Sequence, residues 1–431
     1  MLSRSLHSFI TIITISIVLA TYLIGSLYAQ SNGMDANGTN WLNYKLNNQS
    51  SAESEGERLS EYQYLNDIPS NANILIDNID KLSVQHYKIF NSRYKDDVIP
   101  NLVFIDDTLI FISSTQDILK LDSNLSVIEK KYLKSLPNSI TGILLDDQSN
   151  LILSSYNGII MAIDIDDDYK TIWKNDVSYP ILTAPISLEN KVFVLANDSL
   201  FAIHKQTGSL VWSTSAVKQG LSLKQAYTLS YNNDYIYAGA SNGNFSIVRQ
   251  HNGEVVLKEH LHSTGFNTLN DIKSNILLSG DNIFVSSYGN KTASYNIQTK
   301  SFNWKLNDET TSQPMTLYNK DFIFMTNSNN EIVKISRTNG KIIWKKDLSQ
   351  FSKYNLYSGF LWSKPFIINN NQVISISNKG DIAVLSAIDG KTILTKNLVT
   401  LAPEEFLSTS PLLIYNSIYL ISNMSNIYLI Q

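Results

Sequence analysis

The sequence predicts an all-β fold, a single eight-bladed β-propeller made of four-stranded antiparallel blades. Three observations predict it: short strand-like runs separated by turn residues, one frame that recurs about every 40 to 50 residues, and two chain ends that complement each other.

The chain of 431 residues begins with an apolar segment. Residues 8–29 carry no charge and follow Arg4, and the small residues Ser26 and Ala29 stand near their end. That pattern is typical of a cleaved secretory signal peptide, but a run of about 20 apolar residues can also stay as a membrane anchor. We expect residues 1–29 to be one or the other, and either leads the remainder of the chain out of the cytoplasm.

The next segment, residues 30–70, is rich in Ser, Asn, Gly and Glu. Its few apolar residues show no periodicity, so it cannot bury enough surface to fold. We expect a disordered polar tether here and assign residues 71–431 to the propeller.

The repeated frame is clearest in residues 202–212 and 333–344. Each copy has a strand, a short turn that ends in glycine, and a second strand that ends in tryptophan. We call the last residue of the frame the marker position, and it recurs eight times. The markers are Gln85, Glu129, Trp173, Trp212, Leu257, Trp304, Trp344 and Leu394.

The glycines and tryptophans of the frame have structural roles in this interpretation. A tight turn needs a positive φ angle, which glycine adopts without strain. A tryptophan at the end of a strand packs its large face against the next blade, so we assign these residues to the core and not to cofactor stacking. The structural repeat residues are Trp173, Trp212, Trp304, Trp344, Gly208, Gly253, Gly340 and Gly390.

The two ends of the domain predict how the ring closes. The last strands, within residues 411–431, have no marker strand after them, and the marker strand near residues 81–90 has no blade before it. Pairing the two would remove two open sheet edges. We therefore expect an N-terminal strand to complete the last blade.

Composition excludes several classes of function. The net charge is −4, which gives no basic field for nucleic acid. The chain has no cysteine, so disulfides, thiolate metal sites, a cysteine nucleophile and a lipid on an N-terminal cysteine are all excluded.

Two groups resemble metal sites, but simpler explanations suffice. Asp164 and residues 166–168 fall in a turn of the repeat, where aspartate is common, and the glycine and final glutamate of a calcium loop are missing. His260 and His262 are too few for a zinc site. We predict no catalytic, cofactor-binding or metal-binding residues.

The repeated frame resembles that of the pyrroloquinoline-quinone (PQQ)-like repeat propellers, a family of dehydrogenases and non-enzymes. Within it, the chain is most similar to the propeller lipoproteins of the bacterial outer-membrane β-barrel assembly (BAM) machinery. The segment Leu221-Ser222-Leu223-Lys224-Gln225 resembles their Leu-Ser-Leu-Arg-Gly. The resemblance implies that Leu221, Leu223, Lys224 and, one blade further, Asp271 contact a POTRA repeat of the barrel-inserting subunit.

Three departures from that family matter. Lys224 replaces an arginine and cannot form a bidentate fork, Lys273 replaces an acid, and the lipidated cysteine is absent. Leu221 and Leu223 alternate with Ser222, so both point to one side of an extended chain. That side is either the core or an exposed rim.

The function expected from the resemblance is a non-enzymatic periplasmic scaffold that assists β-barrel assembly. It would sit at the outer-membrane complex, or at the inner membrane if the signal is uncleaved. One alternative is a membrane-tethered ligand-binding or sensory propeller. The other, a PQQ-dependent oxidoreductase, fits poorly, because such family members use a disulfide of adjacent cysteines and longer chains.

Overall fold

The structure is a computed structural model. It describes residues 73–74, 82–88, 102–105, 107–113, 116–214, 229–261, 271–287, 291–354, 360–408, 411–414, 417–424 and 426–431. All of these belong to one compact unit, Arg58–Gln431. The expected leader or anchor (residues 1–29) and tether (residues 30–70) lie outside the described residues.

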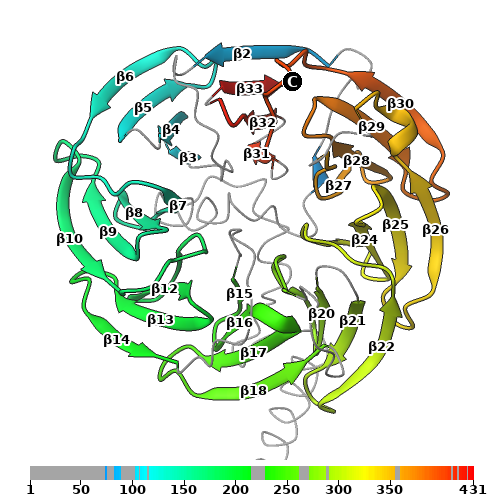
Figure 1. The fold of residues 1–431 in the computed structure, drawn as a ribbon, viewed down its shortest axis with the longest axis horizontal. Coiled ribbons are helices and arrows are strands. Elements are labelled where there is room, and N and C mark those ends of the chain that lie inside the picture. The colour runs from blue at the N-terminus through cyan, green and yellow to red at the C-terminus, as the bar shows by residue number, and fades with distance from the viewer. Residues whose placement is uncertain are drawn as a thin grey trace, which may run out of the picture. The chain divides into compact units, whose positions relative to one another are not determined.

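Eight β-sheets follow one another around a ring (Figure 1). We number the blades in chain order. The first four are β3 (Leu102–Ile105), β4 (Thr108–Ile112), β5 (Asp117–Asp122) and β6 (Val127–Tyr132); β7 (Ile140–Leu145), β8 (Asn150–Ser155), β9 (Ile159–Asp164) and β10 (Lys170–Asp176); β11 (Ile186–Leu188), β12 (Lys191–Ala196), β13 (Ser199–His204) and β14 (Leu210–Ser213); and β15 (Ser230–Tyr231), β16 (Tyr235–Gly239), β17 (Asn244–Arg249) and β18 (Val255–His260).

The other four blades follow. In all eight blades the strands are given from the inner strand, next to the ring axis, to the outer strand. They are β19 (Leu277–Ser279), β20 (Asn282–Ser286), β21 (Lys291–Asn296) and β22 (Ser301–Asn307); β23 (Thr316–Tyr318), β24 (Phe322–Thr326), β25 (Glu331–Ser336) and β26 (Ile342–Asp347); β27 (Phe366–Ile368), β28 (Gln372–Ile376), β29 (Asp381–Ser386) and β30 (Thr392–Asn397); and β31 (Leu412–Ile414), β32 (Ser417–Ile421), β33 (Asn426–Ile430) and β2 (Val84–Lys88). Two 3-10 turns, Ser241–Gly243 and Ser349–Phe351, are the only helical elements among the described residues, and no helix there could span a membrane.

The predicted ring closure is confirmed. The N-terminal strand β2 pairs antiparallel with the last strand, β33, from Val84↔Ile430 to Lys88↔Asn426. The seventh blade carries an addition that the sequence did not predict: β1 (Asn73–Ile74) pairs parallel with the inner strand β27. The eight-bladed prediction is therefore correct, with one blade extended by a short fifth strand.

The strand directions give the ring two distinct faces. The connection face holds the connections between blades and the turns between second and third strands. For example, Tyr156, in the turn after β8, donates its backbone N–H to Ser139 O in the connection just before β7 (2.9 Å). The hairpin face holds the other two turns of each blade, as the bond from Lys205 N to Asn190 O shows (2.8 Å).

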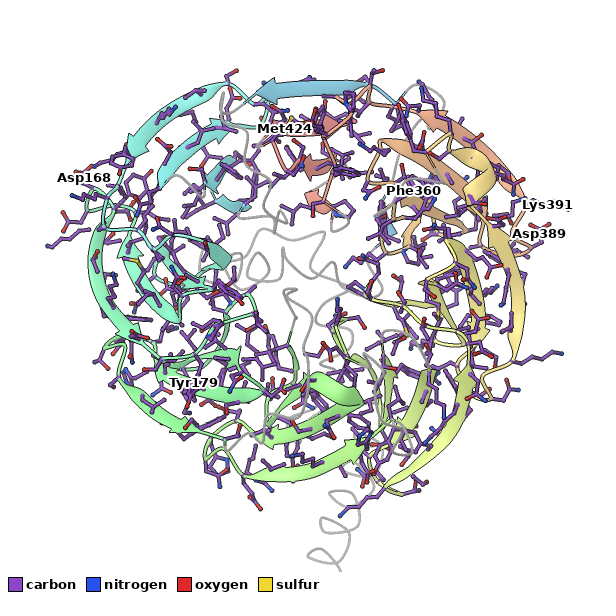
Figure 2. The ribbon with its side chains drawn as sticks, viewed as in Figure 1. Asp168, Tyr179, Phe360, Asp389, Lys391 and Met424 are labelled. Carbon is purple, nitrogen blue, oxygen red and sulfur yellow. The ribbon has the colours of Figure 1, made fainter. Side chains whose placement is uncertain are left out.

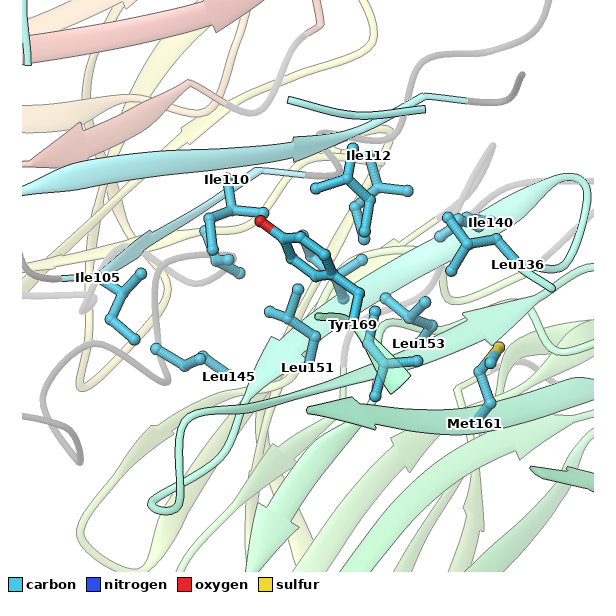
Figure 3. Packing of buried hydrophobic residues seen from close by; sticks show 14 residues of the cluster. Ile105, Ile110, Ile112, Leu136, Ile140, Leu145, Leu151, Leu153, Met161 and Tyr169 are labelled. Carbon is cyan, nitrogen blue, oxygen red and sulfur yellow. The ribbon is translucent and has the colours of Figure 1, made fainter. Parts of the chain in front are cut away.

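The core lies between neighbouring blades. The first and second blades share a cluster that includes Ile110, Leu151 and Tyr169, all buried (Figure 3). The eighth and first blades share another, which includes Leu125 and Leu429. This arrangement lets each blade bury both faces of its sheet, which no blade could do alone.

All eight marker positions lie on outer strands. In the first seven blades, the residue just before the marker has no partner on the neighbouring strand. Such an unpaired residue is a β-bulge. At Trp173, for example, the register shifts between Thr171 and Trp173. Bulges discourage edge-to-edge association. The repeat therefore protects its own exposed edges.

Each marker tryptophan packs on the glycine of the next blade. A Cβ on Gly208 would lie 2.5 Å from Trp173 Cε3, so the glycine supplies space as well as its positive φ of 69°. The indole Nε1 of Trp173 donates to Lys205 O (2.7 Å), which anchors the ring on the same turn. The pairs are Trp173–Gly208, Trp212–Gly253, Trp304–Gly340 and Trp344–Gly390.

Where the marker is not tryptophan, a larger residue stands at the glycine position, four residues before the next marker. Tyr169 faces Glu129, and its hydroxyl donates to Glu129 Oε2 (2.9 Å). Leu125 stands in the same place after Gln85, and Lys300 after Leu257. All three keep positive φ angles: 59° for Tyr169, 63° for Leu125 and 52° for Lys300.

Candidate partner-binding face

The predicted contact residues Leu221, Leu223 and Lys224 lie in residues 215–228, outside the described residues. The ends of this stretch are well held. Thr214 exchanges two hydrogen bonds with Leu200, from Thr214 N to Leu200 O and from Leu200 N to Thr214 Oγ1 (both 2.9 Å). Leu229 is buried in the core between the third and fourth blades. The described residues on either side of the stretch, Thr214 at the end of the outer strand β14 and Leu229 before the inner strand β15, lie on the connection face.

The third and fourth blades are tied together on this face. The Asp198 carboxylate, in the turn after β12, accepts hydrogen bonds from the backbone N–H of Ser241 (3.1 Å) and from its hydroxyl. Hydrogen bonds to an ionised acceptor are stronger than neutral ones. These bonds link the third and fourth blades directly.

Asp271, the fourth predicted contact residue, is described and is 0% exposed. Its neighbour Ile272 donates from its backbone N–H to Ala240 O (3.2 Å) and packs so closely on Gly239 that a Cβ there would lie 2.4 Å from Ile272 Cγ2. Lys273 is also buried. This burial is inconsistent with a direct contact by the Asp271 carboxylate, because residues 271–273 are packed onto the fourth blade.

The marker tryptophans are enclosed to different degrees. Trp173 and Trp304 are buried, whereas Trp212 and Trp344 are half-buried. Figure 2 shows Asp389 and Lys391, which flank the glycine on which Trp344 packs, on the outer rim. The half-buried markers therefore combine core packing with a partly solvated edge.

A buried polar network closes the connection face between the seventh and eighth blades. The Lys379 ammonium donates to Pro403 O (2.9 Å) and Glu405 O (2.6 Å). The Glu405 carboxylate accepts from Asn426 Nδ2 (2.6 Å) and the Tyr428 hydroxyl (2.9 Å). Burial works to raise the pKa of Glu405, but hydrogen bonds from Ser422, Asn426 and Tyr428 outweigh it and lower the pKa.

The acidic residues and His260, which resemble metal ligands in the sequence, lie in turns and strands of the ring. The described residues contain no group of three or more histidine and acidic residues that could hold a metal ion. Asp164 Oδ1 instead accepts the backbone N–H groups of Asp166 (2.9 Å) and Asp167 (3.1 Å), as in an ordinary turn.

Sequence reasoning missed several of these features. Lys379 lies in a turn of the seventh blade and Glu405 in the connection to the eighth, so neither carried a local signal. Tyr169 was hidden because its turn is one residue longer than that of Gly208: Ala162 to Trp173 spans one residue more than Ala202 to Trp212. Counting back from the marker would have found it.

Comparison with known proteins agrees with the ring geometry. The family model described as "Outer membrane protein assembly factor BamB" matches residues 134–346, which hold the second to sixth blades. A BamB of Shewanella oneidensis is 22% identical over 206 residues, which cover 46% of this chain and 50% of that protein. The match thus spans half the length of that relative.

Solved structures share the fold. The crystal structure of BamB from Moraxella catarrhalis superposes with a TM-score of 0.64 at 16% identity, covering 80% of this chain and 100% of that one. A europium-containing methanol dehydrogenase superposes with the same TM-score at 11% identity, covering 84% of this chain and 91% of that one. At such identities the structures establish the fold alone. The chain is therefore an eight-bladed β-propeller, and its residues 134–346 are similar to the outer membrane protein assembly factor BamB.

Proposed function

We propose that this propeller is a non-enzymatic scaffold that assists outer-membrane β-barrel assembly by binding the POTRA region of the barrel-inserting subunit. The observation that supports it most directly is the match of the assembly-factor model to the second to sixth blades. Those blades flank residues 215–228, which hold the leucine pair that resembles the family's contact segment.

The proposed contact is centred on Leu221 and Leu223, with Lys224 beside them. Two adjacent leucines that become buried on binding contribute roughly 3–5 kcal/mol before the costs of association. A lysine at the rim adds mainly orientation and association rate. We leave Asp271 out of the contact because its side chain is buried.

A double substitution tests the contact. Leu221→Ser with Leu223→Ser should abolish binding to the purified POTRA-bearing subunit while the melting temperature stays unchanged. The matched control is Leu210→Ser with Val211→Ser, which removes two aliphatic residues, 53% and 45% exposed, from the outer strand β14 of the third blade. The control should bind normally. Unchanged binding of the Leu221/Leu223 variant with unchanged stability would refute the contact, and a lowered melting temperature would assign the leucines to the core.

The scaffold proposal places the propeller in the periplasm, associated with a membrane through its partner or through residues 8–29. The dehydrogenase neighbours share the fold, so the alternative of a quinone-dependent oxidoreductase has its own test. Purified full-length protein supplied with PQQ and calcium should show neither quinone binding in its absorption spectrum nor alcohol-dependent dye reduction. Either signal would favour the enzyme.

A further inference from the structure

The outer rim of the sixth and seventh blades carries one pattern twice. The two segments are KIIWKK (residues 341–346) and KTILTK (residues 391–396). In each, a lysine follows the turn glycine, an isoleucine occupies the bulge just before the marker, and a second lysine stands two residues after the marker. The outer strands β26 and β30 lie next to each other on the circumference of the ring (Figure 1). The rim therefore presents isoleucines and lysines together over two neighbouring blades.

The apolar side chains of this rim are exposed to solvent. The bulge residues Ile343 and Ile393 are 43% and 45% exposed. In the turn that links β29 to β30, Ile388 is 66% exposed, and its carbonyl accepts the indole N–H of Trp344 (3.1 Å). Trp344 is itself only half-buried. We call Ile343, Trp344, Ile388 and Ile393 the apolar rim patch.

Lysines surround the apolar rim patch. Lys341, Lys391 and Lys396 are all exposed, and Lys391 lies on the outer rim in Figure 2. Asp389 is the only acid within residues 336–346 and 386–396, and it pairs with Lys391 (2.8 Å). The patch thus lies in a positively charged part of the rim.

The second blade shows that the repeat itself does not require this charge. Its bulge residue, Ile172, is also 45% exposed. The turn before it, however, holds Asp164 and residues 166–168, all aspartates, and its lysine, Lys170, pairs with Asp167 (2.9 Å). An exposed isoleucine at the bulge is therefore shared by these blades, whereas the excess of lysine around it is not.

From this combination we propose that the rim of the sixth and seventh blades docks on an anionic phospholipid surface. The lysine ammonium groups meet the lipid phosphates. The isoleucines and the solvated edge of Trp344 enter the boundary between headgroups and acyl chains, where such side chains are favoured. The proposal goes beyond the scaffold function and does not depend on it.

The shape of the rim favours a lipid surface over a protein partner. The rim is the convex circumference of the ring (Figure 1), and a fluid surface can surround separate side chains without a matching groove. A protein strand that paired with β26 or β30 would meet a bulge at Ile343 or Ile393, and bulges discourage edge pairing. Charge and shape therefore agree on the same occupant.

A fluorescent label tests the contact directly. Because the chain has no cysteine, Ile388→Cys in the full-length protein carries a single environment-sensitive fluorophore, nitrobenzoxadiazole. Its emission should rise and shift to the blue on vesicles that contain phosphatidylglycerol, but not on vesicles of phosphatidylcholine alone. The control label at Gln206→Cys, the exposed equivalent position in the turn of the third blade, should keep its aqueous spectrum on both. The label reports its own surroundings, so the result holds wherever else the chain attaches to the vesicles. An unchanged Ile388 label on anionic vesicles would overturn the proposal and favour an acidic protein, and equal responses on both kinds of vesicle would overturn it too.

A lysine variant tests the charge. In the protein labelled at position 388, Lys341→Ser with Lys391→Ser should raise the lipid concentration for a half-maximal response on the order of tenfold, because each lysine near an anionic surface contributes about fivefold. High salt should have the same effect on the unsubstituted protein. An unchanged response of the lysine variant would contradict the proposal.

A matched pair of isoleucine variants tests the apolar part. Ile343→Ser with Ile393→Ser should weaken the response of the same label. The control, Ile128→Ser with Ile172→Ser, changes the bulge residues of the first and second blades, which are 55% and 45% exposed, and should respond as the unsubstituted protein does. Both variants should keep the melting temperature, since all four side chains are exposed. Equal weakening by the two pairs would overturn the assignment to the sixth and seventh blades.

Discussion

The junctions between blades solve one packing problem in two opposite ways. Between the fifth and sixth blades, a large marker, Trp304, meets a residue without a side chain, Gly340. Between the first and second blades the sizes are exchanged: the marker is Glu129, and Tyr169 reaches back from the next blade to meet it. The space between blades is filled in both cases, from opposite sides, so it is the pair of residues that the junction requires and not tryptophan itself.

The exchange also changes the chemistry of the junction. The indole N–H of Trp304 donates to the backbone at Arg337 O (2.9 Å), whereas the Tyr169 hydroxyl donates to a side-chain carboxylate. Burial, together with the hydrogen bond to Glu129, raises the pKa of the Tyr169 hydroxyl, which therefore stays a neutral donor. Asp168, beside it on the rim (Figure 2), pairs with Lys131. The first junction is thus partly electrostatic.

The largest expected effect on stability comes from removing the Tyr169 side chain from the junction between the first and second blades. Tyr169→Gly removes a buried ring from the cluster in Figure 3 and should lower the free energy of unfolding by about 3 kcal/mol, although it relieves the strain of a positive φ. Adding Glu129→Trp should recover about 1–2 kcal/mol, because it converts the junction to the tryptophan–glycine type. Urea denaturation of the two single variants and the double variant measures this coupling. Purely additive losses would show that the two positions do not form a pair.

The second largest effect on stability is expected when a side chain is added at a glycine on which a marker tryptophan packs. A Cβ on Gly340 would lie 2.8 Å from Trp304 Cδ2, at a φ of 72°, so Gly340→Ala should cost about 2–3 kcal/mol. The reverse change at the equivalent position, Lys300→Gly, should leave the stability within about 1 kcal/mol of the wild type, because no tryptophan faces Lys300. Thermal melts of both variants suffice. If Gly340→Ala cost less than about 1 kcal/mol, the Trp304 ring would not need the space at Gly340.

The ring was predictable because its signal is local and repeated. The frame around Trp212 and Trp344 gave the blade number and the outer strands, and the unmatched chain ends gave the closure by β2. The Lys379–Glu405 network between the seventh and eighth blades was not predictable, because these two residues meet only once the blades pack together. β1 was hidden for a different reason: two residues make one short parallel pairing and leave no pattern. The partner contact rests on the resemblance of Leu221 and Leu223 to a family segment.

The smallest expected effect is a pH dependence of the stability contributed by Glu405, at the junction between the seventh and eighth blades. Because hydrogen bonds lower the folded-state pKa of Glu405 below its unfolded value of about 4.3, ionised Glu405 stabilises the folded state above that pH. The contribution is lost as the pH falls through the folded-state pKa. Lys379, which contacts the Glu405 backbone, and Tyr428 keep their protons across this range, so Glu405 is the titrating member of the network. Glu405→Gln should cost about 1 kcal/mol at pH 7 and should flatten the fall in melting temperature as the pH drops below about 4.3. The neighbouring exposed residue supplies the control, since Glu404→Gln should follow the wild-type curve. If Glu405→Gln also followed the wild-type curve, the ionised Glu405 carboxylate would not stabilise the junction between the seventh and eighth blades.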